Sequence, residues 1–356
     1  MTSFFFYEAN LPKILFNQKI TLAFTTYQAG KIIFLSSTNG ETLVKYAKNF
    51  KRPMGIAYDP INQRLAVASK TSIDLFSNSS PLARHFPEYP NKHDHLFIHQ
   101  SRYQTGFLDT HEIEFGNDQL WVVNTMFSCI SSVSPFYHFK TYWKPSFITD
   151  LMPEDRCHLN GLELENGEPA FVTCFDGTNT PFGWKNKTLR TGKLIDIRSN
   201  RTLLDELPMP HSPVLLNDRI YFLLSGTGEV MEYSLKTSKT RCIIKLNSFL
   251  RGLAAFGNFL FVGCSKIRDD TTVFNELEIS SKSSFCGIYV IDLRTGINVA
   301  GITYTDIVKE IFSVKVIPNS ISPGLLTERD EYHDKCILAE EDLNFWINRR
   351  GSPNSL

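Results

Sequence analysis

The chain has no long apolar run, no excess of either charge and no closely spaced pair of cysteines. No segment of its 356 residues approaches the roughly 20 consecutive apolar residues that cross a bilayer, so we expect no transmembrane helix. Residues 1–10 hold three adjacent phenylalanines but lack the basic start and apolar core of a secretory signal. The sequence therefore predicts a protein that is neither exported nor embedded in a membrane.

Charge and cysteine content further limit the classes of protein to which the chain can belong. Lysine plus arginine number 37, as do aspartate plus glutamate, so no overall positive field points to nucleic acid or an anionic membrane as a partner. Seven cysteines are scattered along the chain without a Cys-x-x-Cys pair. An odd, dispersed set is typical of reduced thiols rather than of a disulfide framework, so we predict a cytoplasmic protein.

Helical periodicity is almost absent before the last thirty residues, and a repeat takes its place. Five segments align without a gap: 55–69, 111–125, 160–174, 211–225 and 251–265. Each consists of an apolar run, a polar or glycine-bearing turn and a second apolar run, which is the pattern of strand, turn and strand. A small residue stands fourteen positions after each start: Ser69, Thr125, Cys174, Ser225 and Ser265.

A third and a fourth strand follow in most repeats, and four strands every 40 to 60 residues are typical of a propeller blade. The N-terminal region supplies three strands, near 20–26, 31–35 and 42–46, and residues 312–316 supply a lone innermost strand. Joining them closes the ring without an unpaired inner edge. We predict an all-β, six-bladed β-propeller over residues 1–322. Residues 323–356 form a tail with a short helix near 340–349.

The innermost strand of each blade lines the central channel and starts at one mouth. The alignment therefore brings Gly55, His111, Asn160, His211 and Arg251 to one opening. His158, Asp109, Glu112 and Glu310 flank these starts. Convergent polar groups in a concave opening are the first candidate for a functional site. We assign the catalytic roles to His111, Glu112, His158 and His211, and substrate binding to Asn160, Arg251, Asp109 and Glu310.

Three imidazoles can hold a divalent metal with an open position for water or substrate. His111, His158 and His211 are the candidates for such a site, with zinc, iron or calcium as the ion. The alternative is that they are hydrogen-bonded fillers of a polar channel. Arg251 is a candidate holder of a carboxylate or phosphate group, and a salt bridge to Glu112 or Glu310 is its alternative role.

Two long insertions, 176–190 and 266–285, follow second strands at the same mouth. Loops of this length often cover or line a binding site. We expect them to contribute side chains to the opening, and disordered excursions are the alternative.

Several motifs, in this order along the chain, resemble an uncharacterised bacterial family, a domain of unknown function of the 4915 type. They are 25–31 (TTYQAGK), 52–55 (RPMG), 109–112 (DTHE), 124–129 (NTMFSC), 154–161 (EDRCHLNG), 210–213 (PHSP), 225–229 (SGTGE) and 310–312 (EIF). The resemblance implies no catalytic role, because none is established for the family. The chain departs from the family at Val214 and Leu215, where the family's motif continues with arginine and tryptophan.

Two functions remain open at this stage. One is a hydrolase- or lyase-like enzyme, of the broad type that six-bladed propellers host in the gluconolactonase and strictosidine-synthase groups. Its pocket takes a small molecule or a peptide group, and a metal assists. The other is a non-catalytic module that binds a ligand or a protein at the same opening.

Overall fold

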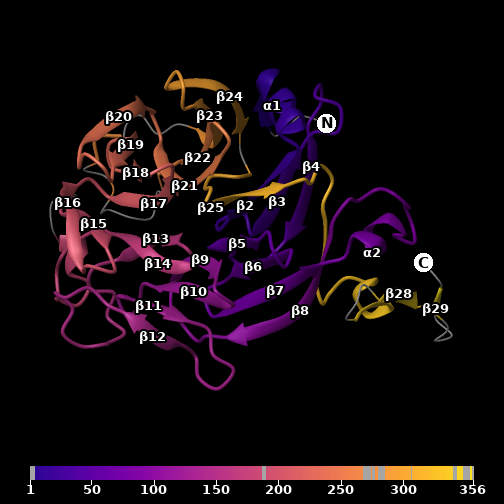
Figure 1. The fold of residues 1–356 in the computed structure, drawn as a ribbon, viewed down its shortest axis with the longest axis horizontal. Coiled ribbons are helices and arrows are strands. Elements are labelled where there is room, and N and C mark those ends of the chain that lie inside the picture. The colour runs from indigo at the N-terminus through magenta and orange to yellow at the C-terminus, as the bar shows by residue number, and fades with distance from the viewer. Residues whose placement is uncertain are drawn as a thin grey trace.

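The computed structural model describes residues 5–186, 190–267, 274, 277–279, 285–305, 307–339, 343–347 and 353–354. Six antiparallel sheets stand around a common axis, so the predicted six-bladed propeller is confirmed (Figure 1). Between the first and second repeats, the segment 81–103 holds the end of helix α2 (Ser80–Arg84) and most of β8 (Leu96–Gln104). Since β8 is the fourth strand of an existing blade, no seventh blade forms there.

Each blade runs outward from the channel in four strands. The first blade contains β5 (Ile56–Asp59), β6 (Arg64–Ala68), β7 (Ser72–Asn78) and β8. The second blade contains β9 (Thr110–Gly116), β10 (Gln119–Asn124), β11 (Cys129–Ser132) and β12 (Lys140–Trp143). The third blade contains β13 (Leu159–Glu165), β14 (Glu168–Cys174), β15 (Gly192–Asp196) and β16 (Arg201–Leu207). The fourth blade contains β17 (Pro210–Leu216), β18 (Arg219–Leu224), β19 (Glu229–Ser234) and β20 (Thr240–Lys245). The fifth contains β21 (Phe249–Phe256), β22 (Phe259–Ser265), β23 (Cys286–Asp292) and β24 (Ile297–Tyr304).

The sixth blade is assembled from both ends of the ring. Its innermost strand is β25 (Ser313–Pro318), and its outer strands are β2 (Ile20–Thr26), β3 (Lys31–Ser36) and β4 (Val44–Asn49). Strand β25 pairs with β2 in antiparallel register, with Leu22 opposite Val316. The predicted closure of the ring is therefore confirmed.

A buried hydroxyl at the end of the second strand connects neighbouring blades. Thr125 Oγ1 donates to the carbonyl of Leu159 at 2.6 Å, and Ser225 Oγ donates to the carbonyl of Leu250 at 2.5 Å. Ser265 and Thr25 make the same kind of bond to Ile311 and Met54. In each case the acceptor lies just before or at the start of the next blade's inner strand. At Thr125, Ser225 and Ser265 the recurring small residue thus connects two blades at the channel mouth, whereas Ser69 donates to the carbonyl of Ser72 within its own blade.

Two N-terminal elements lie outside the repeat. Strand β1 (Phe5–Tyr7) pairs with β24 on the edge of the fifth blade. Helix α1 (Asn10–Gln18) was not predicted. It is short, its N-cap Ala9 makes no side-chain cap, and proline occupies its third position, so the sequence carries only a weak helical signal. Leu11 and Leu15 of α1 are fully buried and pack against the fifth and sixth blades.

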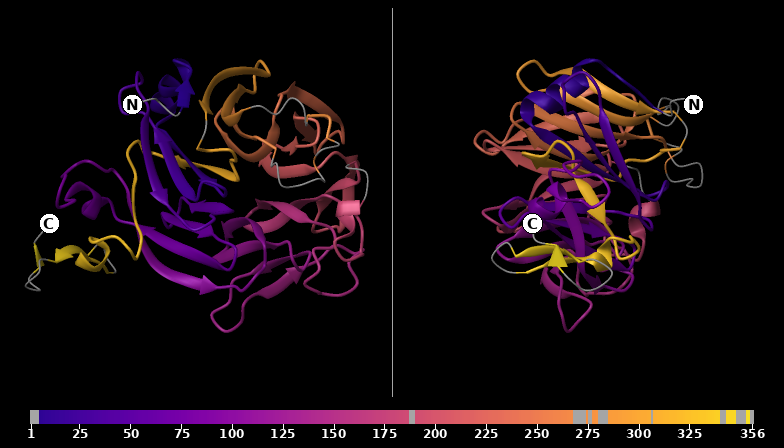
Figure 2. Two further views of the ribbon diagram at one scale, coloured as in Figure 1. Left: turned by 180° about the vertical axis from the view of Figure 1, so that it is seen from behind. Right: turned by 90° about the vertical axis from the view of Figure 1, so that its right-hand side faces the viewer.

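The C-terminal segment forms a small sheet beside the first blade (Figure 2). Strand β26 (Gly324–Leu326) adds in parallel to β8, and a separate sheet contains β27 (Cys336–Leu338), β28 (Asn344–Ile347) and β29 (Pro353–Asn354). The short helix predicted near 340–349 is wrong for residues 344–347, which are β28. Burial alternates along β28, and the buried Trp346 donates from Nε1 to the carbonyl of Leu82 at 3.2 Å. Leu343, just before β28, is neither helix nor strand, and residues 340–342, 348 and 349 of the predicted helix lie outside the described residues.

Among the described residues, no helix has the length and apolar character needed to cross a membrane.

The closure of the ring can be tested by cross-linking. A Leu22→Cys, Val316→Cys variant should form a disulfide on oxidation, because these residues lie opposite each other and belong to the same apolar cluster. The cross-link should raise the free energy of unfolding by about 2–4 kcal/mol. Intact mass and non-reducing electrophoresis measure the bond. A Leu22→Cys, Ile317→Cys variant is the control, since Ile317 faces the other side of β25. Equal cross-linking of both variants would contradict the register.

Candidate functional site

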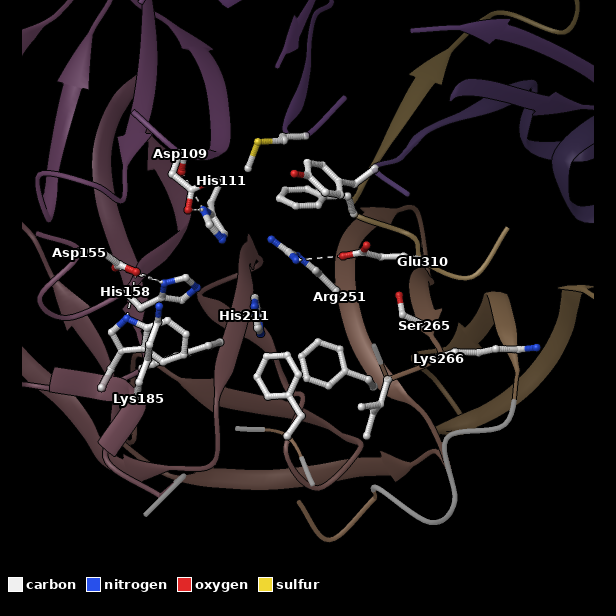
Figure 3. A pocket seen from close by; sticks show the side chains of 18 residues that line it. Asp109, His111, Asp155, His158, Lys185, His211, Arg251, Ser265, Lys266 and Glu310 are labelled. Carbon is white, nitrogen blue, oxygen red and sulfur yellow. Dashed lines mark hydrogen bonds and ion pairs between the residues drawn. The ribbon is translucent and has the colours of Figure 1, made fainter. Parts of the chain in front are cut away.

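A cavity of about 430 Å³ opens where the inner strands begin at one mouth of the channel. Six of the eight residues predicted from the sequence lie in its wall: Asp109, His111, His158, His211, Arg251 and Glu310. The imidazoles and the guanidinium are directed at a common space (Figure 3). Asn160 and Glu112 do not line this cavity.

The inner strands are irregular at the mouth in four consecutive blades. Pairing with the second strand shifts beside Asn124, Gly161, Val214 and Leu253. Such bulges redirect side chains out of the regular alternation of a strand. Asp109, His158 and Ser212 also adopt positive φ angles of 51°, 50° and 51°, which L-residues seldom do. Of these three residues Asp109 and His158 line the cavity, and positive φ angles also occur in turns elsewhere, for example at Asn117 and Asn217.

The environment of His111 determines which ring nitrogen carries its proton. Nδ1 lies 2.8 Å from the carbonyl of Asp109, which can only accept, and 2.8 Å from Thr125 Oγ1. The Thr125 hydroxyl already donates to Leu159, so it accepts from His111. Nδ1 therefore bears the hydrogen, and Nε2 presents a lone pair. Burial, reinforced by the nearby His158 and Arg251, holds the pKa of His111 well below its usual range.

His211 repeats this arrangement two blades further on. Its Nδ1 lies 2.6 Å from Ser225 Oγ and 3.3 Å from the carbonyl of Met209. The Ser225 hydroxyl donates to Leu250, so it too accepts the imidazole hydrogen. Burial and the adjacent Arg251 hold the pKa of His211 well below its usual range. Two neutral imidazoles thus line the cavity, each with a lone pair on Nε2.

His158 differs because its partner is a carboxylate. Nδ1 lies 2.9 Å from Oδ2 of Asp155, and the same oxygen accepts from Nε1 of Trp184 at 2.9 Å. The ring also packs against Phe175, with centroids 4.6 Å apart. Among the described residues, Nε2 of His158 has no hydrogen-bond partner, and Figure 3 shows the ring at the wall of the cavity. A histidine oriented by an aspartate is a common arrangement for a general base.

Arg251 lies across the cavity from this pair. Its guanidinium carbon is 3.4 Å from the centre of the Phe312 ring, and Nη1 is 3.3 Å from a carboxylate oxygen of Glu310. Of the two roles left open by the sequence, the ion pair with Glu310 is therefore present. The Arg251 side chain is 11% exposed and lies in the cavity wall, so it can also bind an anionic group.

Glu112, predicted as a proton-transfer residue, lies inside the channel instead. Its carboxylate accepts from Ser313 Oγ at 3.0 Å and lies 3.8 Å from Nζ of Lys315. Lys315 also pairs with Glu114. Glu112 follows His111 directly on β9, and the change of direction at the mouth sends the two side chains to different levels of the channel. Asn160 accepts at Oδ1 from Thr173 at 2.7 Å and is buried within its blade.

Below the cavity, the channel contains more carboxyl groups than basic groups among the described residues. Burial and neighbouring carboxylates raise the pKa of Glu112 to about 7 and that of Glu163 to about 8, and burial raises the pKa of Glu114. The same carboxylates raise the pKa of Lys315, which remains charged. Protons are therefore retained on buried carboxyl groups near neutral pH, behind the neutral imidazoles of the mouth.

Several cavity residues were not predicted. Asp155 stands three residues before His158 within the 154–161 motif, and its spacing was the available signal. Phe175, Trp184 and Phe249 line the cavity but carry no chemical signature in a sequence rich in aromatic residues. The insertion 176–190 contributes Trp184 and Lys185, as expected of a lining loop. The insertion 266–285 contributes Lys266, Ile267 and Phe274, and most of its other residues lie outside the described residues.

The predicted metal site at the three histidines is not shown by this geometry. In the part of the chain that the structure describes, no group of three or more His, Cys, Asp or Glu side chains is placed to hold a metal ion. The physical reason lies in the packing of the rings. His158 meets His111 edge to face at 4.7 Å, and Phe175 packs against both His158 and His211. The three imidazoles line one cavity without converging on one point.

The fold and the cavity define a six-bladed β-propeller with a polar, aromatic pocket at one axial mouth. A family model described as a domain of unknown function (DUF4915) matches residues 9–326. The chain belongs to that family, which confirms the resemblance seen in the sequence. No curated protein matches it.

Similar solved structures support the fold. A chain from a crystal structure of a nidogen–laminin complex is 12% identical, with a TM-score of 0.56, covering 84% of this chain and 99% of that one. A protein of unknown function from Bacteroides caccae is 10% identical, with a TM-score of 0.52, covering 84% and 98%. At these identities the likeness concerns the fold alone.

The role of the connecting hydroxyl can be tested at Thr125. Thr125→Val should lower the free energy of unfolding by about 1–3 kcal/mol, because the Leu159 carbonyl and the His111 Nδ1–H each lose a buried partner. Urea unfolding measures the change. Thr110→Val is the matched control, since Thr110 is equally buried and its hydroxyl has no partner among the described residues. Equal losses in both variants would show that the hydroxyl bonds at Thr125 are not the cause.

The channel acids predict a pH-dependent effect of Glu163→Gln. The pKa of Glu163 is about 8 in the folded chain, above its unfolded value of 4.5, so folding retains a proton between these values. The wild type therefore loses stability as pH rises from about 5 to 8, and a glutamine, which cannot ionise, avoids this loss. Relative to the wild type, we expect the free energy of unfolding of the variant to be about 1–3 kcal/mol higher at pH 8.5 than at pH 5. Partial solvent access of the carboxyl group keeps this gain below the value that the whole pKa shift would give.

Chemical unfolding at the two pH values measures this difference. Glu165→Gln, on the same strand and paired with Arg198, is the control and should show no such gain. A Glu163→Gln effect that is independent of pH would contradict the assignment.

Proposed function

We propose that the cavity is the active site of a hydrolase- or lyase-like enzyme that acts on a small molecule or peptide group carrying a negative charge. The observation that carries the proposal is the His158–Asp155 pair, with Nε2 of His158 facing a cavity that also contains Arg251. A base with its orienting carboxylate and a cation for an anionic group are the two components that such chemistry requires.

In this mechanism His158 is the general base. It takes a proton at Nε2, either from a water molecule that then attacks a carbonyl carbon or from a substrate C–H or O–H bond that breaks in an elimination. Asp155 stabilises the imidazolium that forms, and Trp184 keeps the carboxylate in position. The proton then returns from Nε2 to the leaving group.

The other cavity residues bind and orient the substrate. Arg251 holds its anionic group, equally in the substrate complex and in the transition state. His111 and His211 accept hydrogen bonds from substrate hydroxyl or amine groups, because both present a lone pair on Nε2. Phe175 and Trp184 exclude water from one side of the reacting group. Proton transfer is assigned to histidine rather than to a metal because the described residues offer no set of metal ligands.

The alternative is a non-catalytic module that binds a small molecule or a peptide at the same mouth. The aromatic share of the wall favours it, since Phe175, Trp184 and Phe249 can hold a ligand without any reaction. We further propose that the protein acts in the cytoplasm, where its seven free thiols would stay reduced, and that neither nucleic acid nor membrane is its partner.

The proposal is tested by a substrate screen followed by variants. Wild-type protein is incubated with carboxylate-bearing esters, lactones, peptides and β-hydroxy acids, and products are identified by mass spectrometry. For any substrate found, His158→Gln and Asp155→Asn should lower kcat about 100-fold or more. Arg251→Gln should mainly raise KM, because it removes binding that is common to substrate and transition state.

His99→Gln is the matched control, because His99 also pairs with an aspartate, Asp74, at 2.8 Å but lies outside the cavity. Its kcat should stay within about twofold of the wild type. Ligands that bind and are never turned over would favour the binding module. Turnover that survives His158→Gln but is lost on chelation would replace the histidine mechanism with a metal-dependent one.

A further inference from the structure

A second cavity, of about 570 Å³, adjoins the first at the same mouth. The two share four wall residues: Tyr27, Lys266, Ile267 and Glu310. The rest of the second cavity comes from the β2–β3 turn after Tyr27, residues 50–52 after β4, and Lys309 before β25. A ligand seated in the first cavity can therefore extend into the second without leaving the protein surface.

The second cavity is strongly basic on a chain whose net charge is zero. Four cations line it, and its one carboxylate, Glu310, is already bound by Arg251 at 3.3 Å. Within the described part of the chain, no carboxylate forms an ion pair with Lys51, Arg52 or Lys309. The charge of the cavity is therefore available to a ligand, which must be anionic to be attracted.

The basic side chains are carried by a constrained backbone. The amide of Phe50 donates to the carbonyl of Gly30 at 2.9 Å, so the segment that bears Lys51 and Arg52 is held against the β2–β3 turn. Arg52 itself has a positive φ of 49°, and its guanidinium carbon lies 5.9 Å from the centre of the Tyr27 ring. These contacts fix the backbone that carries the two cations, while the side chains of Lys51 and Arg52 remain exposed.

The remaining two lysines are held in the same way. The amide of Lys266 donates to the carbonyl of Lys309 at 2.9 Å, which joins the end of β22 to the segment before β25. Nζ of Lys266 lies 3.3 Å from the carbonyl of Thr305. The four cations thus come from three separate parts of the chain that the propeller brings together around one cavity.

We propose that the second cavity binds a second anionic group of the same ligand, so that the molecule recognised at this mouth is an extended dianion. This inference rests on the proposed function for the placement of the first anionic group at Arg251. The second group is a carboxylate or a phosphate, because Lys51, Arg52 and Lys309 recognise both. A monoanion fills the first cavity alone and gains nothing from these three cations.

Ligand-observed NMR titration of the full chain with simple probes tests the idea. The probes are the straight-chain dicarboxylates succinate, pimelate and azelate, each compared with the monocarboxylate of equal length. Phosphonocarboxylates of matching length form a second series that distinguishes phosphate from carboxylate. At least one dianion should bind about tenfold more tightly than its monoanion, which corresponds to about 1.4 kcal/mol.

The variant Arg52→Gln, Lys309→Gln should abolish this preference while leaving monoanion affinity within about twofold. Arg251→Gln should weaken both classes of probe. Lys236→Gln is the control, since Lys236 is exposed and pairs with Asp218 on the outside of another blade. Thermal unfolding of each variant verifies that it is folded.

Each outcome separates the two proposals. If dianions bind no more tightly than monoanions, the second-anion site is overturned, whereas monoanion binding that depends on Arg251 leaves the proposed function in place. Dianion and monoanion binding that are both unaffected by Arg251→Gln overturn the joint site and remove the assigned role of Arg251. Weaker binding of both classes in Arg251→Gln, with the dianion preference lost only in the Arg52→Gln, Lys309→Gln variant, supports both proposals.

Discussion

The hydrogen bond from a buried hydroxyl to the next blade is the interaction on which the mouth of the channel depends. The donor is Thr125 or Ser225, at the end of a second strand, and the acceptor is a carbonyl of the following blade. Because the hydroxyl's hydrogen is used in this way, only its lone pairs remain for the histidine beside it. One small residue therefore joins two blades and determines which nitrogen of the imidazole faces the cavity.

Burial then has opposite consequences at two levels of the channel. At the mouth it keeps His111 and His211 neutral, and deeper inside it keeps protons on Glu112 and Glu163. Both effects follow from the cost of a charge in a poorly solvated space. The cations Arg251 and Lys315 retain their charge in this neutral background, and of these two it is Arg251 that lines the cavity at the mouth.

Sequence reasoning located the mouth correctly but not every role within it. The gap-free alignment placed His111, His211 and Arg251 together, because equivalent positions in a propeller share one height on the axis. It could not separate His111 from Glu112, since the direction of each side chain depends on a bulge that only strand pairing reveals. Nor could it choose Asp155 as the partner of His158, because the hydrogen bond depends on positive φ angles at both residues.

The sequence by itself determined the inner strands, the six blades and the way the ring closes, because alternating apolar runs and turn residues act locally and repeat. It also determined the absence of a strong helical pattern, although α1 and β28 show where short segments follow tertiary packing instead. Only the tertiary structure decided the tautomers of the histidines, the separation of the rings by Phe175 and the meeting of four cations from three distant segments around one cavity. These depend on distances between residues that are far apart in the chain, and no local pattern encodes such distances.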